Sequence, residues 1–313
     1  MHSTEHTMQR PAWVGDYFVK RFWRIAPLFY SVIAVMILLP VIASRTWMID
    51  IEKLLLNLTF TFGFTPWEGI VMAGWTVSVE MLFYAILPVL MLTVRTMSAT
   101  LALLFASLFV SYFMRTSLHV HYEHTLSQYG YNWSYFSFGS NLCFFAMGMY
   151  AFRLTRHFSA DTLIMRWGMP TVSVMLLGAF MFTGLDMPMK GIGRIDLIVW
   201  GVAFTTLCVW QSTRPSLWCA NRALEYAGER SYSIYLLHPM VIVFFKTPIR
   251  QTYDFFSPYI GSYAFFICGL LVIALILISS EITYRVIEIP GIRYGQRVIK
   301  NRKQQCGLEQ ARS

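Results

Sequence analysis

Long apolar runs, separated by short stretches that carry most of the charge, limit what this chain can fold into. Of its 313 residues, 56% are hydrophobic and 13% are charged, whereas a soluble domain carries about 25% charged residues. Runs of about 20 apolar residues are long enough to cross a bilayer as helices. The sequence therefore leaves no room for a separate soluble catalytic domain. It predicts an all-α, polytopic membrane helical bundle with about eight transmembrane helices.

One further apolar segment, residues 47–66, has two alternative placements. It is apolar in its second half but begins with Asp50, Glu52 and Lys53, so it is either re-entrant or spanning. The eight expected spans are residues 25–44, 71–93, 98–117, 135–154, 169–186, 194–211, 231–248 and 258–281.

Positive charge is spread along the chain, mainly between the apolar runs. The net charge is +9, but Lys and Arg do not gather in one patch, which argues against a nucleic acid partner. If the eight spans alternate and 47–66 does not cross, 18 of the 25 Lys and Arg fall on one side and 7 on the other. Because cytoplasmic loops retain positive charge, we expect a multi-pass protein of the cell inner membrane with both termini in the cytoplasm.

The expected spans divide the chain into three parts. Residues 1–24 form a cytoplasmic N-terminal segment without the apolar core of a signal peptide, and residues 25–281 form the membrane domain. Residues 282–313 form a basic cytoplasmic tail in which Lys and Arg stand among Ile, Val and Tyr. We expect this tail to begin as a helix that lies on anionic membrane lipid.

Two arginines mark the start of the first span, in the sequence FVKRFWRIAPLFY (residues 18–30). Arg21 and Arg24 are three residues apart, which puts both guanidinium groups on one face of a helix. Such a pair can grip a phosphorylated ligand, because a guanidinium binds phosphate through two parallel hydrogen bonds. The alternative is that both are ordinary cytoplasmic cations that set the topology.

An acidic residue lies inside the second span, in GWTVSVEMLFYAILP (residues 74–88). Glu80 is some ten residues into this apolar run, where an ionisable group is costly unless it faces a polar interior. Trp75 and Ser78 precede it, and the spacing puts Ser78 and Glu80 on different faces of the helix. Glu80 is thus a candidate functional residue, the alternative being a structural ion pair with an Arg of another helix.

A histidine follows a polar stretch at the start of the seventh span, in GERSYSIYLLHPMV (residues 228–241). His238 can shuttle a proton near neutral pH, and Pro239 frees a backbone carbonyl and kinks the helix. The alternative is an interior histidine that is simply hydrogen-bonded. A fourth motif, SSEITYRVIEIPG (residues 279–291), contains Glu281 and Arg285, whose spacing favours a local ion pair.

No metal site is expected. The run HVHYEH contains His119, His121 and His124, but it lacks cysteine partners and a matching second half. The five cysteines form no paired motif and fall mostly in or beside apolar runs, so they indicate neither a metal site nor a disulfide framework.

These four motifs, in this order, resemble those of the acyltransferase-3 family of integral membrane acyltransferases. That family includes enzymes that O-acetylate exopolysaccharides and lipopolysaccharide O-antigens. The shared blocks are an arginine box ending in Arg-Ile-x-Pro, Trp-Thr/Ser-x-x-x-Glu, Ser-Tyr-Ser-x-Tyr-Leu-x-His-Pro and Tyr-Arg-x-x-Glu-x-Pro. Each block is weak alone, but the four together run from Phe18 to about Arg293 and cover nearly the whole chain.

The resemblance implies an enzyme that transfers an acetyl or short acyl group from acyl-CoA to a hydroxyl of a cell-envelope or exported polysaccharide. Acetyl-CoA or another acyl-CoA would be a co-substrate, no cofactor would stay bound, and the acceptor would be a glycan or lipid-linked glycan. Arg21 and Arg24 would engage the phosphates of coenzyme A, and Glu80 and His238 would be the catalytic candidates. The residues expected along the substrate pathway are Trp75, Ser78, Ser231, Tyr232 and Tyr235.

The chain departs from the family at its start. Members usually begin with two further helices, the first of which carries an arginine and, eleven positions later, the histidine taken as the catalytic base. His2 and His6 lie in a polar segment and cannot take that role. We therefore expect an upstream start codon, a truncated and inactive copy, or a divergent member that uses His238 as the base.

Two other classes remain as alternatives to an enzyme. One is a transporter or flippase, although such folds often show paired inverted repeats and no convincing internal repeat is visible. The other is a non-catalytic membrane subunit of polysaccharide synthesis, which would tolerate loss of Glu80 and His238.

Overall fold

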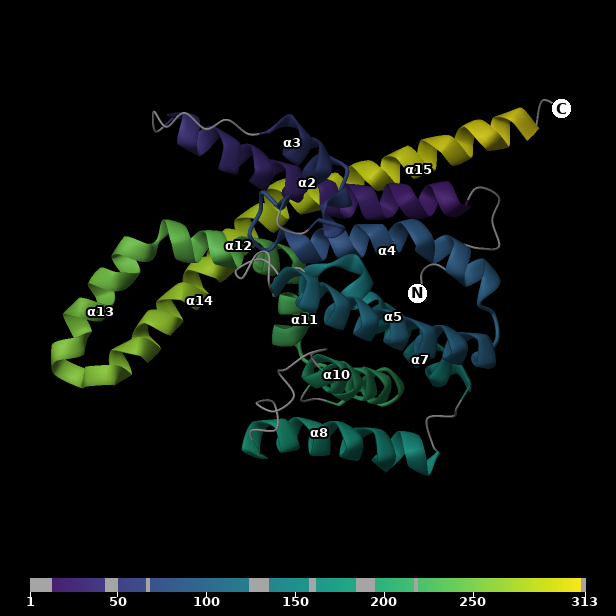
Figure 1. The fold of residues 1–313 in the computed structure, drawn as a ribbon. Coiled ribbons are helices and arrows are strands. Elements are labelled where there is room, and N and C mark those ends of the chain that lie inside the picture. Colours follow the sequence, from purple (N-terminus) through teal and green to yellow (C-terminus); the bar gives the residue numbers. More distant parts are fainter. Residues whose placement is uncertain are drawn as a thin grey trace. The chain divides into compact units, whose positions relative to one another are not determined.

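The computed structural model describes residues 13–42, 50–65, 68–123, 135–157, 162–183, 195–216 and 219–310. Every regular element within these residues is helical, which confirms the all-α fold class (Figure 1). The chain divides into two compact bodies. Of the described residues, those within 55–69 and 78–224 form the first body, and those within 13–54, 70–77 and 225–310 form the second.

The first body is a set of long helices joined side to side by polar contacts with backbone carbonyls. Ser111 donates to the Gly139 carbonyl at 3.0 Å, and the buried Arg115 donates to the Ser140 carbonyl at 2.7 Å. Ser173 donates to the Ala203 carbonyl at 2.9 Å. Small hydroxyl side chains of this kind let apolar helices approach closely. The helices are α4 (Gly74–Thr93, which begins in the second body), α5 (Met97–Glu123), α7 (Phe138–His157), α8 (Met169–Thr183) and α10 (Ile195–Thr213).

The second body joins the two ends of the chain. Figure 1 shows α15 alongside α2, and α13 and α14 as a hairpin. A π-helical turn, η5 (Tyr284–Glu288), links α14 to α15 without a break in the helical path. Its helices are α2 (Trp13–Ile42), α11 (Arg222–Glu229), α12 (Ser231–Phe244), α13 (Lys246–Ile260), α14 (Ala264–Thr283) and α15 (Ile289–Gln310).

Within the described residues, six of the eight expected spans each lie largely on one helix. The other two do not: residues 231–248 run past the end of α12 into α13, and residues 258–281 start in α13 and include the turn at Gly261–Tyr263. By length and composition, four helical stretches of the described residues could cross a bilayer: Trp13–Leu39, Gly74–Thr93, Met97–Ser117 and Lys246–Gln305. A shorter apolar helix covers Ser231–Phe244. The outward faces carry large apolar side chains, as on α5, where Phe109 is 70% exposed. This pattern suits contact with lipid, while the count of eight spans and the position of the termini stay predictions.

The start of α2 and the structure of segment 47–66 also bear on the expected layout. Helix α2 begins at Trp13, well before residue 25, so Arg21 and Arg24 lie within the helix and not ahead of it. In segment 47–66 the described residues form α3 (Ile51–Leu58) and a short 3-10 turn at Thr61–Gly63. An eight-residue helix is about 12 Å long, too short for a hydrocarbon core of about 30 Å, which favours the re-entrant placement.

Helix α15 packs on α2 where a proline has removed a backbone donor. Pro27 has no N–H, so the Trp23 carbonyl four residues earlier loses its helical partner. The backbone of α15 approaches this point so closely that a Cβ at Gly291 would lie 2.7 Å from the Trp23 oxygen. The Trp23 and Tyr294 rings lie 4.3 Å apart, and Lys303 Nζ lies 3.5 Å from the carboxylate of the buried Asp16. This seam sets the position of the arginine-bearing turn of α2.

We expect Gly291→Ala to destabilise the protein by about 1–3 kcal/mol, because the added methyl group overpacks a backbone contact that cannot move independently. The measurement is the apparent Tm of the purified protein in detergent micelles. Gly269→Ala on α14 is the matched control, since a Cβ there meets nothing within 4 Å. An unchanged Tm for Gly291→Ala would contradict this prediction, because it would show that α2 and α15 can move apart to fit the methyl group at no cost in stability.

Candidate functional site

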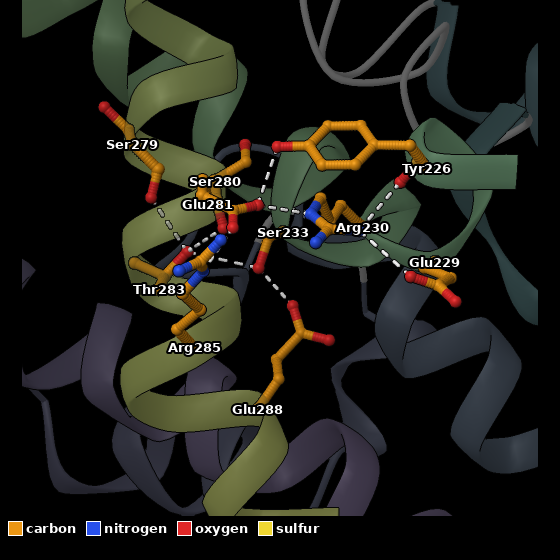
Figure 2. Close-up of polar contacts among 10 residues, drawn as sticks. All are labelled: Tyr226, Glu229, Arg230, Ser233, Ser279, Ser280, Glu281, Thr283, Arg285 and Glu288. Carbon is orange, nitrogen blue, oxygen red and sulfur yellow. Dashed lines mark hydrogen bonds and ion pairs between the residues drawn. The ribbon is translucent and has the colours of Figure 1, made fainter. Parts of the chain in front are cut away.

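Four helical elements of the second body bring charged and hydroxyl side chains together at the junction of α11, α12, α14 and η5. Figure 2 shows Glu281 at the centre of this cluster. Its carboxylate accepts hydrogen bonds from the Tyr226 hydroxyl at 2.7 Å and from the guanidinium groups of Arg230 and Arg285. The local pair predicted between Glu281 and Arg285 is confirmed. It is only one part of a larger contact, in which Arg230 at the start of α12 reaches Glu281 of α14 across 51 residues of sequence.

Two aromatic rings lie close to the guanidinium of Arg230. Its guanidinium carbon lies 3.7 Å from the Tyr226 ring centroid and 4.5 Å from that of Tyr284, within cation–π range. It also donates to Glu229 at 3.0 Å. The hydrogen bond with Glu281 raises the pKa of Arg230, and the hydrogen bond to the same carboxylate raises the pKa of the Tyr226 phenol. Both side chains therefore keep their protons throughout the physiological range.

A buried carboxylate lies beside this cluster. Glu288 is 2% exposed, and its side chain accepts a hydrogen bond from the buried Ser233 hydroxyl (Figure 2). The Thr283 hydroxyl lies 3.1 Å from the Ser233 oxygen. The guanidinium groups of Arg24 and Arg230 both interact electrostatically with Glu288. Positive charge from α2 and α12 thus compensates a carboxylate that would be costly to bury alone.

Helix α12 is tied directly to the arginine-bearing turn of α2. The Tyr232 hydroxyl donates to the carbonyl oxygen of Ile25 at 2.8 Å, next to Arg24 in the sequence. Arg24 is exposed, while Arg21 is partly exposed and lies over the Tyr17 ring at 5.8 Å. Both arginines can therefore be reached by a soluble anion, which is the property that a phosphate-binding pair requires.

His238 makes a contact within its own helix. Its Nδ1 atom lies 2.6 Å from the carbonyl oxygen of Tyr235, and the rings of these two residues are 5.6 Å apart. The histidine is partly buried. It lies six residues beyond Tyr232, which is about 9 Å further along α12 than the contact with α2.

The candidate residues of the second span, Glu80, Ser78 and Trp75, lie in different surroundings. The Tyr84 hydroxyl donates to the Glu80 carboxylate one turn away on α4, so Glu80 has a partner on its own helix. Ser78 is fully buried, donates to the Phe60 carbonyl and accepts from the Gly63 N–H at 2.6 Å. These bonds use the Ser78 hydroxyl to hold a tight turn in which Phe60 has a φ of +58°. Trp75 is partly buried in the first turn of α4.

The structure gathers Arg24, Tyr232, Ser233 and Glu288 in one place within the second body. Tyr235 and His238 belong to the same body, and Ser231 is exposed at the start of α12. Glu80 and Ser78 belong to the first body. His2, His6 and His124 lie outside the described residues, as do the side chains of His119 and His121.

Sequence reasoning missed Tyr226 and assigned Arg230 only a topological role. A signal for both was present, because Tyr226 and Arg230 are four residues apart and α11 leads into α12. What the spacing could not indicate is the partner, since Glu281 belongs to a helix far along the chain.

The chain was compared with protein families, curated proteins and solved structures. A family model described as an acyltransferase domain matches residues 8–279, well over half of the chain. No curated protein and no solved structure matches.

Two arginines that bind the same carboxylate offer a matched pair of variants. We expect Arg230→Ala to lower the free energy of unfolding by about 2–4 kcal/mol, because it removes charged hydrogen bonds and contacts with two rings from a side chain only 11% exposed. Arg285→Ala should cost less than about 1 kcal/mol, because that side chain is 71% exposed. Apparent Tm values in detergent compare the two. Equal losses of stability would contradict the expectation that Arg230 contributes more than Arg285.

Proposed function

The chain belongs to the acyltransferase family whose model it matches, and we propose that this membrane acyltransferase takes its acyl group from acyl-CoA. The group is acetyl or another short acyl. The acceptor is a hydroxyl of a cell-envelope or exported polysaccharide, presented as a glycan or lipid-linked glycan. Acyl-CoA binds as a co-substrate and free coenzyme A is released. No cofactor stays bound.

The observation that carries this proposal is the hydrogen bond from Tyr232 to the Ile25 carbonyl. It joins the helix of His238 to the helix turn of Arg24 within one compact body. Acyl-CoA is a long molecule with its phosphates at one end and its thioester at the other. A donor held at Arg21 and Arg24 by its phosphates can extend its thioester along α12 towards His238, about 9 Å further on.

The electrostatics of the site support an anionic donor. Arg21 and Arg24 lie on α2 at accessible positions, and the basic stretch of α15 packs along the same helix. The nearby carboxylates have partners: Glu281 binds Arg230 and Arg285, and Glu288 binds Ser233. Paired carboxylates repel a phosphate less than free ones, so the surface around the two arginines suits phosphate binding.

The reaction needs a base within reach of the acceptor hydroxyl. We assign this role to His238 in the chain as it stands, with Glu80 serving the acceptor or the acyl intermediate. Trp75, Ser231 and Tyr235 line the route of the substrates in this proposal. The site belongs to a multi-pass protein of the inner membrane whose two termini face the cytoplasm, where acyl-CoA is found.

The phosphate role of the arginines is tested by binding. We expect Arg21→Ala and Arg24→Ala each to weaken acetyl-CoA binding about 10- to 100-fold, since each removes charge-assisted hydrogen bonds. Equilibrium binding of radiolabelled acetyl-CoA to purified protein in detergent gives the Kd, and 3′-dephospho-acetyl-CoA shows which phosphate each arginine contacts.

The matched control is Arg250→Ala on α13, an arginine whose side chain is 80% exposed and which lies outside the proposed site, so this change should leave the Kd unchanged. Unchanged binding in all three variants would contradict the arginine pair. Transfer itself is measured with [14C]acetyl-CoA in inverted membrane vesicles, as label that mild alkali releases from polysaccharide. If His238→Ala and Glu80→Gln transfer as much label as the unaltered chain, the catalytic roles are wrong.

A further inference from the structure

The proline after His238 creates an acceptor inside α12. Pro239 lies within the helix and has no N–H, so the carbonyl of Tyr235, four residues earlier, cannot receive its normal helical hydrogen bond from position 239. In an apolar surrounding a backbone carbonyl without a partner is costly. The sequence therefore places a carbonyl oxygen that needs a donor one turn before a histidine.

His238 is the side chain that meets this carbonyl. Its Nδ1 atom lies 2.6 Å from the Tyr235 oxygen, and a carbonyl oxygen can only accept. The proton of this bond must therefore belong to Nδ1. In a neutral imidazole only one nitrogen carries a proton, so the lone pair is on Nε2.

We propose that Pro239 is a positioning residue that fixes the tautomer of His238, so that Nε2 is the nitrogen that accepts a proton. The catalytic part of this inference rests on the proposed function, whereas the tautomer does not. An orienting hydrogen bond at one ring nitrogen sets the function of the other, as a carboxylate does for the histidine of serine hydrolases. Here the orienting group is a backbone carbonyl.

The direction of proton transfer follows from this tautomer. The lone pair of Nε2 takes the proton of the acceptor hydroxyl while the hydroxyl oxygen bonds to the thioester carbonyl carbon. The carbon–sulfur bond then breaks, the sulfur leaves with the bonding electrons, and Nε2 returns the proton to give free coenzyme A. The Nδ1–H···O bond stabilises the imidazolium that exists between these two transfers.

A second interior proline of the second body, in α2, shows that this arrangement is not a general consequence of proline. Pro27 frees the Trp23 carbonyl, and there the backbone of α15 at Gly291 closes over the position. At Pro239 the site is filled by a titratable side chain of the same helix. Both prolines lie inside a helix, but different groups lie next to the two carbonyl oxygens that they leave without a helical partner.

The tautomer is read directly by NMR of the full chain, labelled with 15N-histidine, in detergent micelles at a pH where His238 is neutral. His238→Asn identifies the signal by difference. We expect the unaltered chain to carry the proton on Nδ1. In Pro239→Ala the new N–H can bond to the Tyr235 carbonyl, so the ring should shift towards the Nε2–H form that free imidazole side chains favour in water. An Nε2–H tautomer in the unaltered chain would overturn the proposal.

Activity tests whether the effect passes through His238. Pro239→Ala should lower kcat for acetyl transfer by about 10²-fold or more, since general bases contribute about 10²–10⁴-fold. Its Tm should hold or rise, because alanine suits a helix interior better than proline. Adding Pro239→Ala to His238→Ala should cause no further loss, whereas a purely structural effect would add. Additive losses, or unchanged kcat in the single variant, would contradict a positioning role.

The matched control is Pro258→Ala, which removes an interior proline from the exposed helix α13 and should change neither kcat nor the His238 signal. If His238→Ala keeps full activity, the proposed base is wrong. The NMR result still decides the tautomer in that case, so the two failures are distinguishable.

Discussion

Much of this structure depends on one constraint: a backbone carbonyl inside an apolar helix must have a donor or close cover from protein. A proline inside a helix removes the N–H that would otherwise bond to the carbonyl four residues earlier. At Pro27 the cover comes from the backbone of α15, which requires glycine at position 291. At Pro239 the donor is His238. The first event docks the C-terminal helix against the arginine-bearing turn, and the second orients a candidate base, so both parts of the site begin with a missing N–H.

Interactions between carboxylates and arginines hold the rest of the site together. Glu281 and Glu288 lie about two turns of helix apart and interact with arginines from other elements, Glu281 with Arg230 at the start of α12 and Glu288 with Arg24 of α2. Arg230 binds Glu281 and lies close to the rings of Tyr226 and Tyr284, so its guanidinium is already engaged within the protein. Arg24 is exposed and Arg21 is partly exposed, so these two differ from Arg230 in that a soluble anion can reach them.

The fold class and the helices were predictable because apolar length is a property of local sequence. Helix boundaries were less so: α2 continues back to Trp13 because packing against α15 stabilises a segment that hydropathy alone does not mark. At the site, the Glu281–Arg285 pair follows from spacing. The bond from Arg230 to Glu281 could not be predicted, because it spans 51 residues and depends on how α12 packs against α14.

Helix α12 connects α2 with η5 because its polar side chains point in different directions. Tyr232 donates to α2, and Ser233, one residue and about 100° further round, donates to Glu288 of η5. His238 turns back on its own helix to Tyr235. A shift of α12 by one residue would break the first two contacts together, whereas the contact between His238 and Tyr235 moves with the helix. The register of this single helix therefore sets both its contact with the arginine-bearing turn of α2 and its contact with the buried Glu288.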